Sequence, residues 1–413
     1  MTAAWNVLVF LNAKNDLEQY AFRNFDQMAR IGSTPEVNLL VELGRPRRRP
    51  RIPPYSLAHG GWSKTLRFHV TAGQQPIEAH AVEDLGATNM GDAATLARFV
   101  QWARERYPAK RTLLVIWNHG QGWRAEPDGE AQPSAKASAV TAAGLAGGHR
   151  YVSTDDDTRD KLYNRAIQDA LAQQLGSDRI DVIAFDACLM AMIETAYALR
   201  GVAHVMVGSE ELEPANGWNY ERWLAPLTAR KGDVSATELG AVMVNAMKDE
   251  YGDLDDTTLS AIALDKIDGL AAEVTAFADL AIEQLSPATL PAFIAARGAC
   301  DNYAPGYGMH SIDLGRYMEQ LALQTSLPAA LRSGAASVRA QLDVAVTANY
   351  ASSKRQGRYG SRGLAIYYPR SATSYAGDPD REGYAANNAH VSVEFVDSQR
   401  WAAFLRAYWK LVP

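Results

Sequence analysis

Two strand-like segments that each stop close to a reactive side chain place the strongest constraint on this fold. The apolar, β-branched run at 112–117 is followed by His119, and a similar run at 180–185 is followed by Cys188. Apolar runs of this kind are typical of strands in a parallel sheet that helices cover on both faces. The carboxyl ends of such strands share one edge of the sheet, and ligands bind there. We therefore expect His119 and Cys188 to meet at that edge.

The rest of the chain is consistent with one α/β architecture. Strand and helix patterns alternate in the first half, which predicts a mostly parallel sheet, and the second half is more helical. We divide the chain into a catalytic core at 1–230 and a mainly helical region at 231–413 that packs on the core and contributes strands. The predicted strands are 5–11, 37–43, 66–70, 112–117, 180–185, 202–207, 259–264 and 363–368. The predicted helices are 17–30, 91–107, 159–175, 189–199, 237–251, 266–283, 287–297, 311–324 and 328–348, with a final amphipathic helix around 401–409.

A linker at 124–150 interrupts the predicted core. It consists largely of Ala, Gly, Pro and Ser, with few large apolar residues that could pack. A loop of this length is uncommon in a compact domain unless it is functional or disordered. We therefore expect a flexible connection between the two reactive segments.

Composition argues against several partners. Of 413 residues, 47% are hydrophobic and 21% are charged, and the net charge of −6 gives no reason to expect nucleic acid as a partner. No apolar run is long enough to predict a membrane span, and the N-terminus shows no secretory signal. The two cysteines, Cys188 and Cys300, fit a reducing compartment. We therefore expect a cytoplasmic protein.

Cys188 and His119 have the residue types of a nucleophile and its general base. A thiol becomes a good nucleophile when an adjacent imidazole takes its proton. The helix expected at 189–199 would begin directly after Cys188, so that its N-terminus would help to hold the thiolate. The alternative for Cys188 is a small buried core residue. The pairing with His119 favours catalysis.

Two glycines follow the histidine and suggest a site for a developing negative charge. Gly120 and Gly122 leave the backbone open to a substrate. We expect the N–H groups of Gly120 and Cys188 to form an oxyanion hole. The alternative is a glycine turn beside a surface histidine.

Acidic and aromatic residues near these strand ends are candidates for substrate binding. Asp186 shares a strand face with Cys188, and a buried carboxylate there needs a partner. Three roles stay open for Asp186: it orients His119, it anchors local backbone, or it receives a cationic side chain of the substrate. The segment 208–220 should lie on the same edge, although a plain solvated loop is the alternative. Its candidate substrate-binding residues are Ser209, Glu210, Glu211 and Trp218, and Glu213 would add negative charge there.

No motif in the sequence predicts a required cofactor. Zinc-type CxxC and HExxH patterns, a Walker sequence and a strand-linked GxGxxG are all absent. The acids at 155–157 offer carboxylates to Ca²⁺ but lack the spacing of an EF-hand. We favour an N-cap and first turn for the helix predicted at 159–175. We therefore expect no metal site.

At these residues the chain resembles the clostripain family of cysteine peptidases. The resemblance runs from about Trp5 to Trp409. The matching pieces are Trp117-Asn-His119-Gly, Ser153-Thr-Asp-Asp, Phe185-Asp-Ala-Cys188-Leu-Met, Gly208-Ser-Glu-Glu, Gly217-Trp-Asn-Tyr220 and Gly363-Leu-Ala-Ile-Tyr-Tyr-Pro369.

The resemblance implies a caspase-like three-layer α/β/α sandwich with a mostly parallel central sheet. It implies that Cys188 is the nucleophile, that His119 is the general base and acid, and that Asp186 lies at the base of a pocket for Arg or Lys. It also implies activation by self-cleavage in the loop after the catalytic histidine. The basic residues of that loop are Arg124, Lys136 and Arg150, of which Lys136 is preferred because it lies among small residues in mid-linker.

Three functions are consistent with this sequence. The first is a cysteine endopeptidase that cleaves protein or peptide substrates after basic residues. The second is a restrained or inactive regulatory protein on the same fold, which needs an activating partner protein. The third is a peptide ligase that uses the same thioester. Fold alone does not decide between them.

Overall fold

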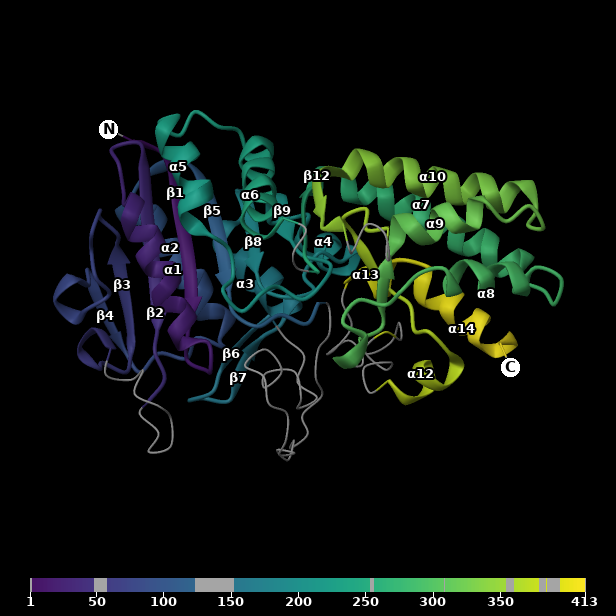
Figure 1. The fold of residues 1–413 in the computed structure, drawn as a ribbon, viewed down its shortest axis with the longest axis horizontal. Coiled ribbons are helices and arrows are strands. Elements are labelled where there is room, and N and C mark those ends of the chain that lie inside the picture. Colours follow the sequence, from purple (N-terminus) through teal and green to yellow (C-terminus); the bar gives the residue numbers. More distant parts are fainter. Residues whose placement is uncertain are drawn as a thin grey trace.

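A nine-stranded sheet dominates the structure (Figure 1). The computed structural model describes residues 2–47, 58–122, 152–252, 256–307, 309–353, 360–378, 384 and 394–412. The strand order is β12-β10-β9-β8-β5-β1-β2-β3-β4, and β2, β1, β5, β8 and β9 pair in parallel, so the prediction of a mostly parallel sheet is confirmed. The strand bounds are β1 Ala3–Asn12, β2 Val37–Gly44, β3 Thr65–His69, β4 Glu83–Gly86, β5 Ala109–Trp117, β8 Ile180–Asp186, β9 Ala203–Gly208, β10 Thr258–Ala263 and β12 Val346–Ala351.

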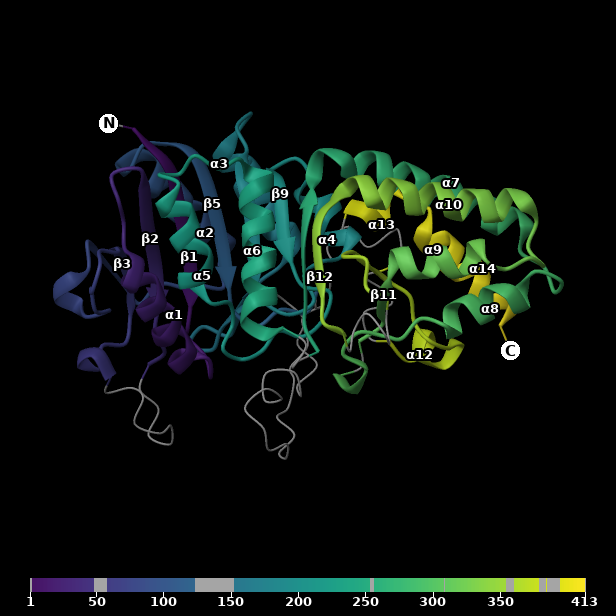
Figure 2. The same ribbon diagram turned by 45° about the horizontal axis from the view of Figure 1, so that its top comes forward.

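Helices bury both faces of this sheet. Side chains alternate along a strand, so Val7 and Val9 of β1 pack into one core while Leu8 and Phe10 pack into the other. Figure 2 shows α1, α5 and α6 along the nearer face. Those three helices are α1 Glu18–Ile31, α5 Tyr220–Ala229 and α6 Ala236–Tyr251, and the opposite core includes α2 Ala93–Arg106, α3 Asn164–Leu175 and α4 Ile193–Leu199.

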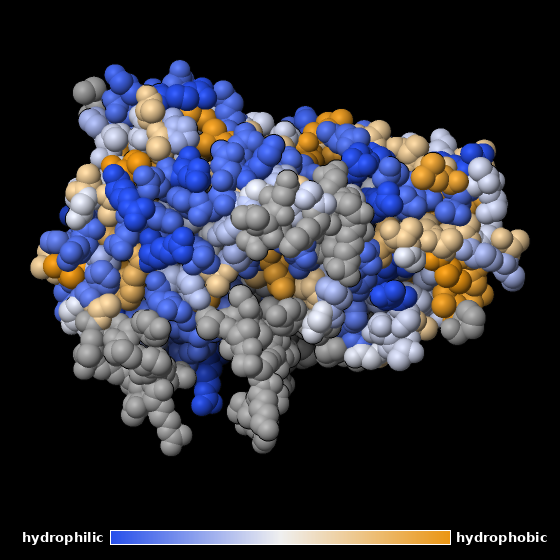
Figure 3. Space-filling view, in the orientation of Figure 1, coloured by the Kyte–Doolittle hydropathy of each residue, from blue (hydrophilic) through white to orange (hydrophobic). Residues whose placement is uncertain are grey.

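A group of helices extends from the β12 side of the sheet (Figures 1 and 2). They share a buried core with α2, α3 and α4. Apolar atoms gather at their outer end in Figure 3, and the exposed large apolar residues include Ile294, Leu323, Val344 and Leu411. None of the helices in the described ranges is long and apolar enough to span a bilayer. The bounds are α7 Ile267–Gln284, α8 Leu290–Gly298, α9 Leu314–Ala322, α10 Ala329–Ala345, α12 Ala372–Gly377, α13 Glu394–Ser398 and α14 Trp401–Leu411.

The second half of the chain also contacts the segment that follows β8. β11 (Ser311–Asp313) and β13 (Ala365–Tyr367) form a small antiparallel sheet. The Ala365 N–H donates to the Ala191 carbonyl over 2.8 Å, and the Tyr367 N–H donates to the Glu194 carboxylate over 3.0 Å. The segment just after Cys188 is therefore held by the C-terminal half.

Four predicted helices were wrong in part, and α5 was not predicted. The helix expected at 159–175 begins only at Asn164, because β6 (Ser153–Asp155) and β7 (Asp160–Leu162) form a hairpin first. The helix expected at 189–199 begins at Ile193. The predictions at 311–324 and 328–348 merged β11 with α9 and α10 with β12. In three of these cases, at 159–175, 311–324 and 328–348, a short strand adjoins a helix, and tertiary pairing rather than local pattern decides its conformation.

Candidate active site

The sheet register brings the two reactive residues to one edge. Trp117 at the end of β5 pairs with Asp186 at the end of β8, and the Asn118 N–H donates to the Asp186 carbonyl over 3.3 Å. His119 and Cys188 each lie two residues beyond this pair. Neighbouring parallel strands thus deliver an imidazole and a thiol to the same place.

The imidazole of His119 is bound to a carboxylate from a third strand end. His119 Nε2 lies 2.8 Å from Asp16 Oδ1, in the loop that follows β1. Burial alone would raise the pKa of Asp16, but the hydrogen bond and the positive charge of His119 outweigh it and lower that pKa below its ordinary value. Asp16 is therefore an ionised carboxylate at neutral pH.

The thiol of Cys188 is half-buried and accepts a backbone hydrogen bond. The Glu213 N–H donates to Cys188 Sγ over 3.2 Å. Burial raises the pKa of Cys188 to about 12; the Glu213 N–H opposes this rise, and nearby carboxylates add to it. Cys188 is therefore a neutral thiol at neutral pH, so a base must remove its proton before attack.

The expected helix N-terminus does not support the thiolate. α4 begins at Ile193 with Met192 as its N-cap, so the residues directly after Cys188 are not helical. Leu189 has φ +64°, a left-handed conformation that non-glycine residues rarely adopt. Its N–H donates to the Glu211 carbonyl over 3.1 Å. Tertiary hydrogen bonds thus override the helix pattern at this point.

Within the part of the chain that the structure describes, no hydrogen bond joins His119 to Cys188. The imidazole is bound to Asp16, and the sulfur is bound to the Glu213 N–H. The two residues are adjacent through their strands but are not engaged with each other. Proton transfer from the thiol therefore requires these two side chains to come into contact.

Gly120 lies directly against the backbone of Cys188. A Cβ on Gly120 would come within 2.3 Å of the Cys188 carbonyl oxygen and 2.9 Å of the Cys188 nitrogen, which only glycine avoids. Among the described residues, the N–H groups of Gly120 and Cys188 donate to no protein acceptor. Two donors that lie close together without acceptors suit a developing oxyanion.

Asp186 is one member of a buried acid pair. Its Oδ2 accepts the Tyr220 hydroxyl over 2.9 Å and the Trp218 N–H over 3.3 Å. Burial raises the pKa of Asp186 to about 6, although these bonds oppose the rise. Glu213 lies beside it: burial and the charge of Asp186 raise the pKa of Glu213 well above normal. Two full negative charges on this buried pair are therefore disfavoured.

Trp218 and Gly217 pack closely against the acid pair of Asp186 and Glu213. Trp218 is buried, and its Nε1 donates to Glu213 Oε1 over 3.1 Å. A Cβ on Gly217, at φ +60°, would lie 2.9 Å from Asp186 Oδ1. Of the roles left open for Asp186, backbone anchoring is thus observed at Trp218, and His119 is oriented by a different carboxylate.

Ser209, Glu210 and Glu211 bind other parts of the protein. Ser209 Oγ contacts the Thr258 hydroxyl of β10 at 2.8 Å. The carboxylates of Glu210 and Glu211 accept backbone N–H groups of the C-terminal half, at Gly363 and Ala304 respectively. All three side chains are buried. Their contacts join the core to the second half of the chain. The buried carboxylates of Glu210 and Glu211 therefore have a structural role that does not require a substrate.

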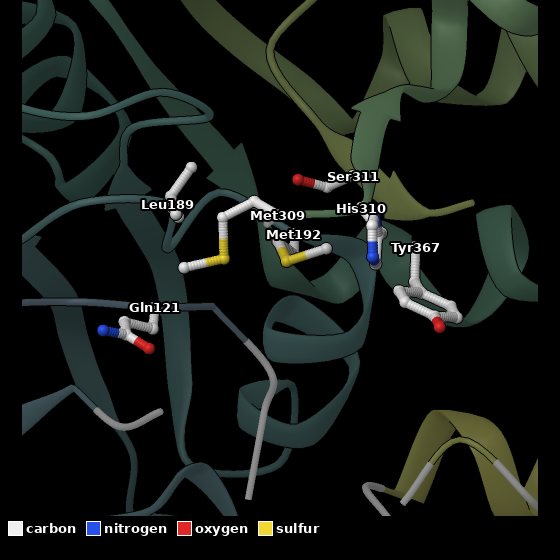
Figure 4. Close-up of a pocket in the computed structure, with 7 residues that line it drawn as sticks. All are labelled: Gln121, Leu189, Met192, Met309, His310, Ser311 and Tyr367. Carbon is white, nitrogen blue, oxygen red and sulfur yellow. The ribbon is translucent and has the colours of Figure 1, made fainter. Parts of the chain in front are cut away.

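A small cavity lies where the reactive loops meet the C-terminal half (Figure 4). The loops after His119 and Cys188 contribute Gln121, Leu189 and Met192 to it. Two thioethers, Met192 and Met309, lie near its centre in Figure 4. The other lining residues are His310, Ser311 and Tyr367.

The acidic run at 155–157 stabilises a turn. Asp155 is buried, and its carboxylate accepts the N–H groups of Asp157 and Thr158 and that of Met90. Lys14 Nζ lies 3.3 Å from the same carboxylate. The described residues contain no cluster of three or more His, Cys, Asp or Glu that could hold a metal. The expectation of a helix N-cap here was wrong, because Asp155 organises the β6–β7 hairpin.

Sequence reasoning missed Asp16 altogether and treated Glu213 only as additional loop charge. The cleavage candidates Arg124, Lys136 and Arg150 lie outside the described residues. The position of Asp16 could have identified it, because the loop after a central parallel strand lies at the ligand-binding edge of the sheet.

A thiol, an imidazole and two unoccupied backbone donors at the carboxyl edge of a parallel sheet define a site of the cysteine-peptidase type. The chain belongs to the clostripain family, whose model matches residues 9–405. It is 23% identical to clostripain of Hathewaya histolytica over 253 residues, which is 56% of this chain and 44% of that protein. The chain thus matches less than half the length of this relative.

Two solved structures share the fold. One is a secreted cysteine protease from Bacteroides thetaiotaomicron in complex with an irreversible peptide inhibitor, with a TM-score of 0.64, 18% identity, and coverage of 97% of this chain and 100% of that one. The other is an inactive zymogen protease from Parabacteroides distasonis, with a TM-score of 0.61, 19% identity, and coverage of 92% and 94%. The expected caspase-like sandwich is confirmed by these neighbours.

Proposed function

We propose that this protein is a cysteine endopeptidase that cleaves after Arg or Lys through Cys188 and His119. The observation that carries the proposal is the delivery of a thiol and an imidazole to one sheet edge by two neighbouring strands, beside a buried acid pair. Its substrates are proteins or peptides, and no step needs a cofactor. Cys188 and Cys300 are both free cysteines, which supports the further proposal of a cytoplasmic location.

The high pKa of Cys188 favours general-base catalysis over a preformed ion pair. His119 takes the thiol proton as the sulfur bonds to the substrate carbonyl carbon. The carbonyl oxygen becomes an oxyanion held by the N–H groups of Gly120 and Cys188. As the oxyanion collapses, the C–N bond breaks, and His119 gives its proton to the leaving amine. Water, deprotonated by His119, then attacks the thioester, and Cys188 regains its proton as the C–S bond breaks.

The acid pair of Asp186 and Glu213 supplies the proposed specificity. A buried pair of acids on which two negative charges are disfavoured matches one guanidinium or ammonium group. Trp218 would form a flat wall beside the aliphatic stem of that side chain. A substrate with an uncharged residue before the scissile bond would leave the charge of Asp186 without a cationic partner.

A panel of fluorogenic peptides that differ only at the residue before the scissile bond tests this function. We expect the wild type to cleave the Arg and Lys peptides. Asp186→Asn keeps an acceptor for Trp218 and Tyr220 but removes the charge, and we expect it to lower kcat/KM for basic peptides on the order of 100-fold. Asp181→Asn, on the same strand and bound to the Thr112 N–H, is the matched control and should keep wild-type selectivity. Unchanged Arg preference in Asp186→Asn would move the specificity role elsewhere.

We propose that the enzyme cuts its own linker after Lys136. Intact-mass spectrometry of purified wild type should give fragments that end at 136 and begin at 137, and Lys136→Ala should abolish that pair. A Cys188→Ala chain, which has no nucleophile, should stay full length. A fully active wild type with an uncut linker would contradict the proposal, and a cut at Arg124 or Arg150 would relocate it.

A restrained form of the same peptidase is the second candidate. It is favoured by the contacts of the thiol, because Cys188 Sγ accepts the Glu213 N–H and, among the described residues, forms no hydrogen bond with His119. In this version, linker cleavage or an activating protein rearranges the loop around Glu213. This candidate would be supported if the wild type cleaved no peptide of the panel until it had been treated with limited trypsin.

A further inference from the structure

We propose that Asp16 is the positioning residue of this site: its carboxylate holds His119 so that ring nitrogen Nδ1 takes the Cys188 proton. This inference rests on the proposed peptidase function. It assigns a role to a residue of the loop after β1, far from both reactive residues in the chain. The geometry that supports it involves the loops after β1 and β5 and the strand β6.

The contact itself fixes the tautomer of His119. His119 Nε2 and Asp16 Oδ1 are 2.8 Å apart. An ionised carboxylate only accepts hydrogen bonds, so Nε2 must carry the hydrogen and donate it. In the neutral ring the other nitrogen, Nδ1, is then the one with a free lone pair. Asp16 thereby selects the nitrogen that acts as the base.

The two loops are joined one residue before each partner. Asn15 precedes Asp16, Asn118 precedes His119, and Asn15 Nδ2 donates to Asn118 Oδ1 over 3.0 Å. Asn15 Oδ1 also accepts the Leu17 N–H over 2.9 Å, which closes the turn that carries Asp16. Because both amides are buried, these bonds fix the backbone positions of Asp16 and His119 relative to each other.

The same network extends to strand β6. Asn118 Nδ2 donates to the Asn12 carbonyl over 2.6 Å. Asn12 Nδ2 donates to Ser153 Oγ and to the Thr154 carbonyl, each over 2.8 Å. The contact between Asp16 and His119 is therefore supported by a connected set of buried side chains, as expected of a preorganised catalytic pair.

The other nearby acid is engaged elsewhere. Asp186 accepts the Tyr220 hydroxyl and the Trp218 N–H, and among the described residues the ring of His119 is hydrogen-bonded to Asp16 alone. A carboxylate bound to the far nitrogen of a catalytic imidazole both orients it and stabilises the imidazolium that forms after proton transfer. Asp16 has the position for both effects.

Kinetics of Asp16→Ala and Asp16→Asn on the best peptide of the panel test this role. We expect Asp16→Ala to lower kcat on the order of 100-fold, because the base is neither oriented nor stabilised, with KM changed by less than about threefold. Asp16→Asn, which still offers an oxygen to Nε2, should lie between it and the wild type. Asp26→Ala, at an exposed aspartate of α1, is the matched control and should leave both constants unchanged. A wild-type kcat in Asp16→Ala, or a change confined to KM, would overturn the inference.

A second readout does not depend on activity. In ¹⁵N-histidine NMR of the wild type, His119, assigned by its loss in His119→Ala, should show the Nε2–H tautomer once the pH is high enough for its ring to be neutral. That signature should weaken or invert in Asp16→Ala and persist in Asp26→Ala. If the wild type cleaves no peptide, the proposed function fails while the NMR result still decides the role of Asp16. An Nδ1–H tautomer in the wild type would overturn the inference whatever the activity.

Discussion

Replacing Cys188 with alanine is expected to abolish peptide cleavage, with kcat lowered by roughly 10⁴-fold or more, because no other group can form the acyl intermediate. The fold should survive. The side chain is half-buried, and within the described residues its polar contacts are to the backbone of Glu213, whose N–H donates to Sγ over 3.2 Å and whose carbonyl lies 4.0 Å from it. The free energy of unfolding should therefore fall by only about 1 kcal/mol. Initial rates on the Arg and Lys peptides, together with a thermal melt, measure both effects.

The second cysteine provides the matched control with the opposite pattern. Cys300 is buried, and its Sγ contacts the Ala296 carbonyl at 3.4 Å inside the helical region. Cys300→Ala should keep full activity while losing about 1–2 kcal/mol of stability through the small cavity that it leaves. Full cleavage by Cys188→Ala, or inactivity of Cys300→Ala in a folded state, would contradict the assignment of the nucleophile.

Gly120→Ala is expected to inactivate the enzyme without removing any functional group. The new Cβ would lie 2.3 Å from the Cys188 carbonyl oxygen and 2.9 Å from the Ala187 Cβ, so the strand-end backbone that carries the nucleophile must move. Misplacement of an active-site group by about 1 Å costs on the order of 100-fold in rate, and the overpacking costs about 1–3 kcal/mol of stability. Peptide kinetics and chemical denaturation measure these two losses.

Gly201→Ala is the matched control, because it replaces a glycine by alanine where the added Cβ causes no steric clash. Gly201 follows the end of α4, and a Cβ there would meet no atom within 4 Å. That variant should match the wild type in activity and in free energy of unfolding. If Gly120→Ala also kept the activity of the wild type, the close packing of the two strand-end loops would not be needed for catalysis.

The parallel strands of the sheet were accessible from sequence because buried strands carry a local signal. Continuous β-branched runs at β1, β5 and β8 predicted both the sheet and the edge where His119 and Cys188 lie. The backbone just after Cys188 was not accessible. Residues 189–192 have a helical pattern, but they are not helical: Ala191 is hydrogen-bonded to Ser209 and Ala365, which belong to chain segments that no local window includes.

Local sequence also could not predict the contact between Asp16 and His119. Asp16 and His119 are 103 positions apart, and their contact follows from two strands being neighbours in the sheet. Once the order β8-β5-β1 is known, an acid in the loop after β1 becomes an obvious candidate. The sequence indicated that His119 and Cys188 belong to the site. Only the strand order identified Asp16 as the third residue.

The pairing of β5 with β8 has a consequence for a chain cut between residues 123 and 151. The two products would carry the imidazole and the thiol on separate polypeptides, yet their strands would form one continuous sheet joined where β5 pairs with β8: β1, β2 and β5 belong to one product, and β8 and β9 to the other. Such a nicked molecule would be an obligate heterodimer with one composite core. Its recovery from denaturant would become a second-order process, faster at higher protein concentration, whereas the uncut chain would refold at a rate independent of concentration.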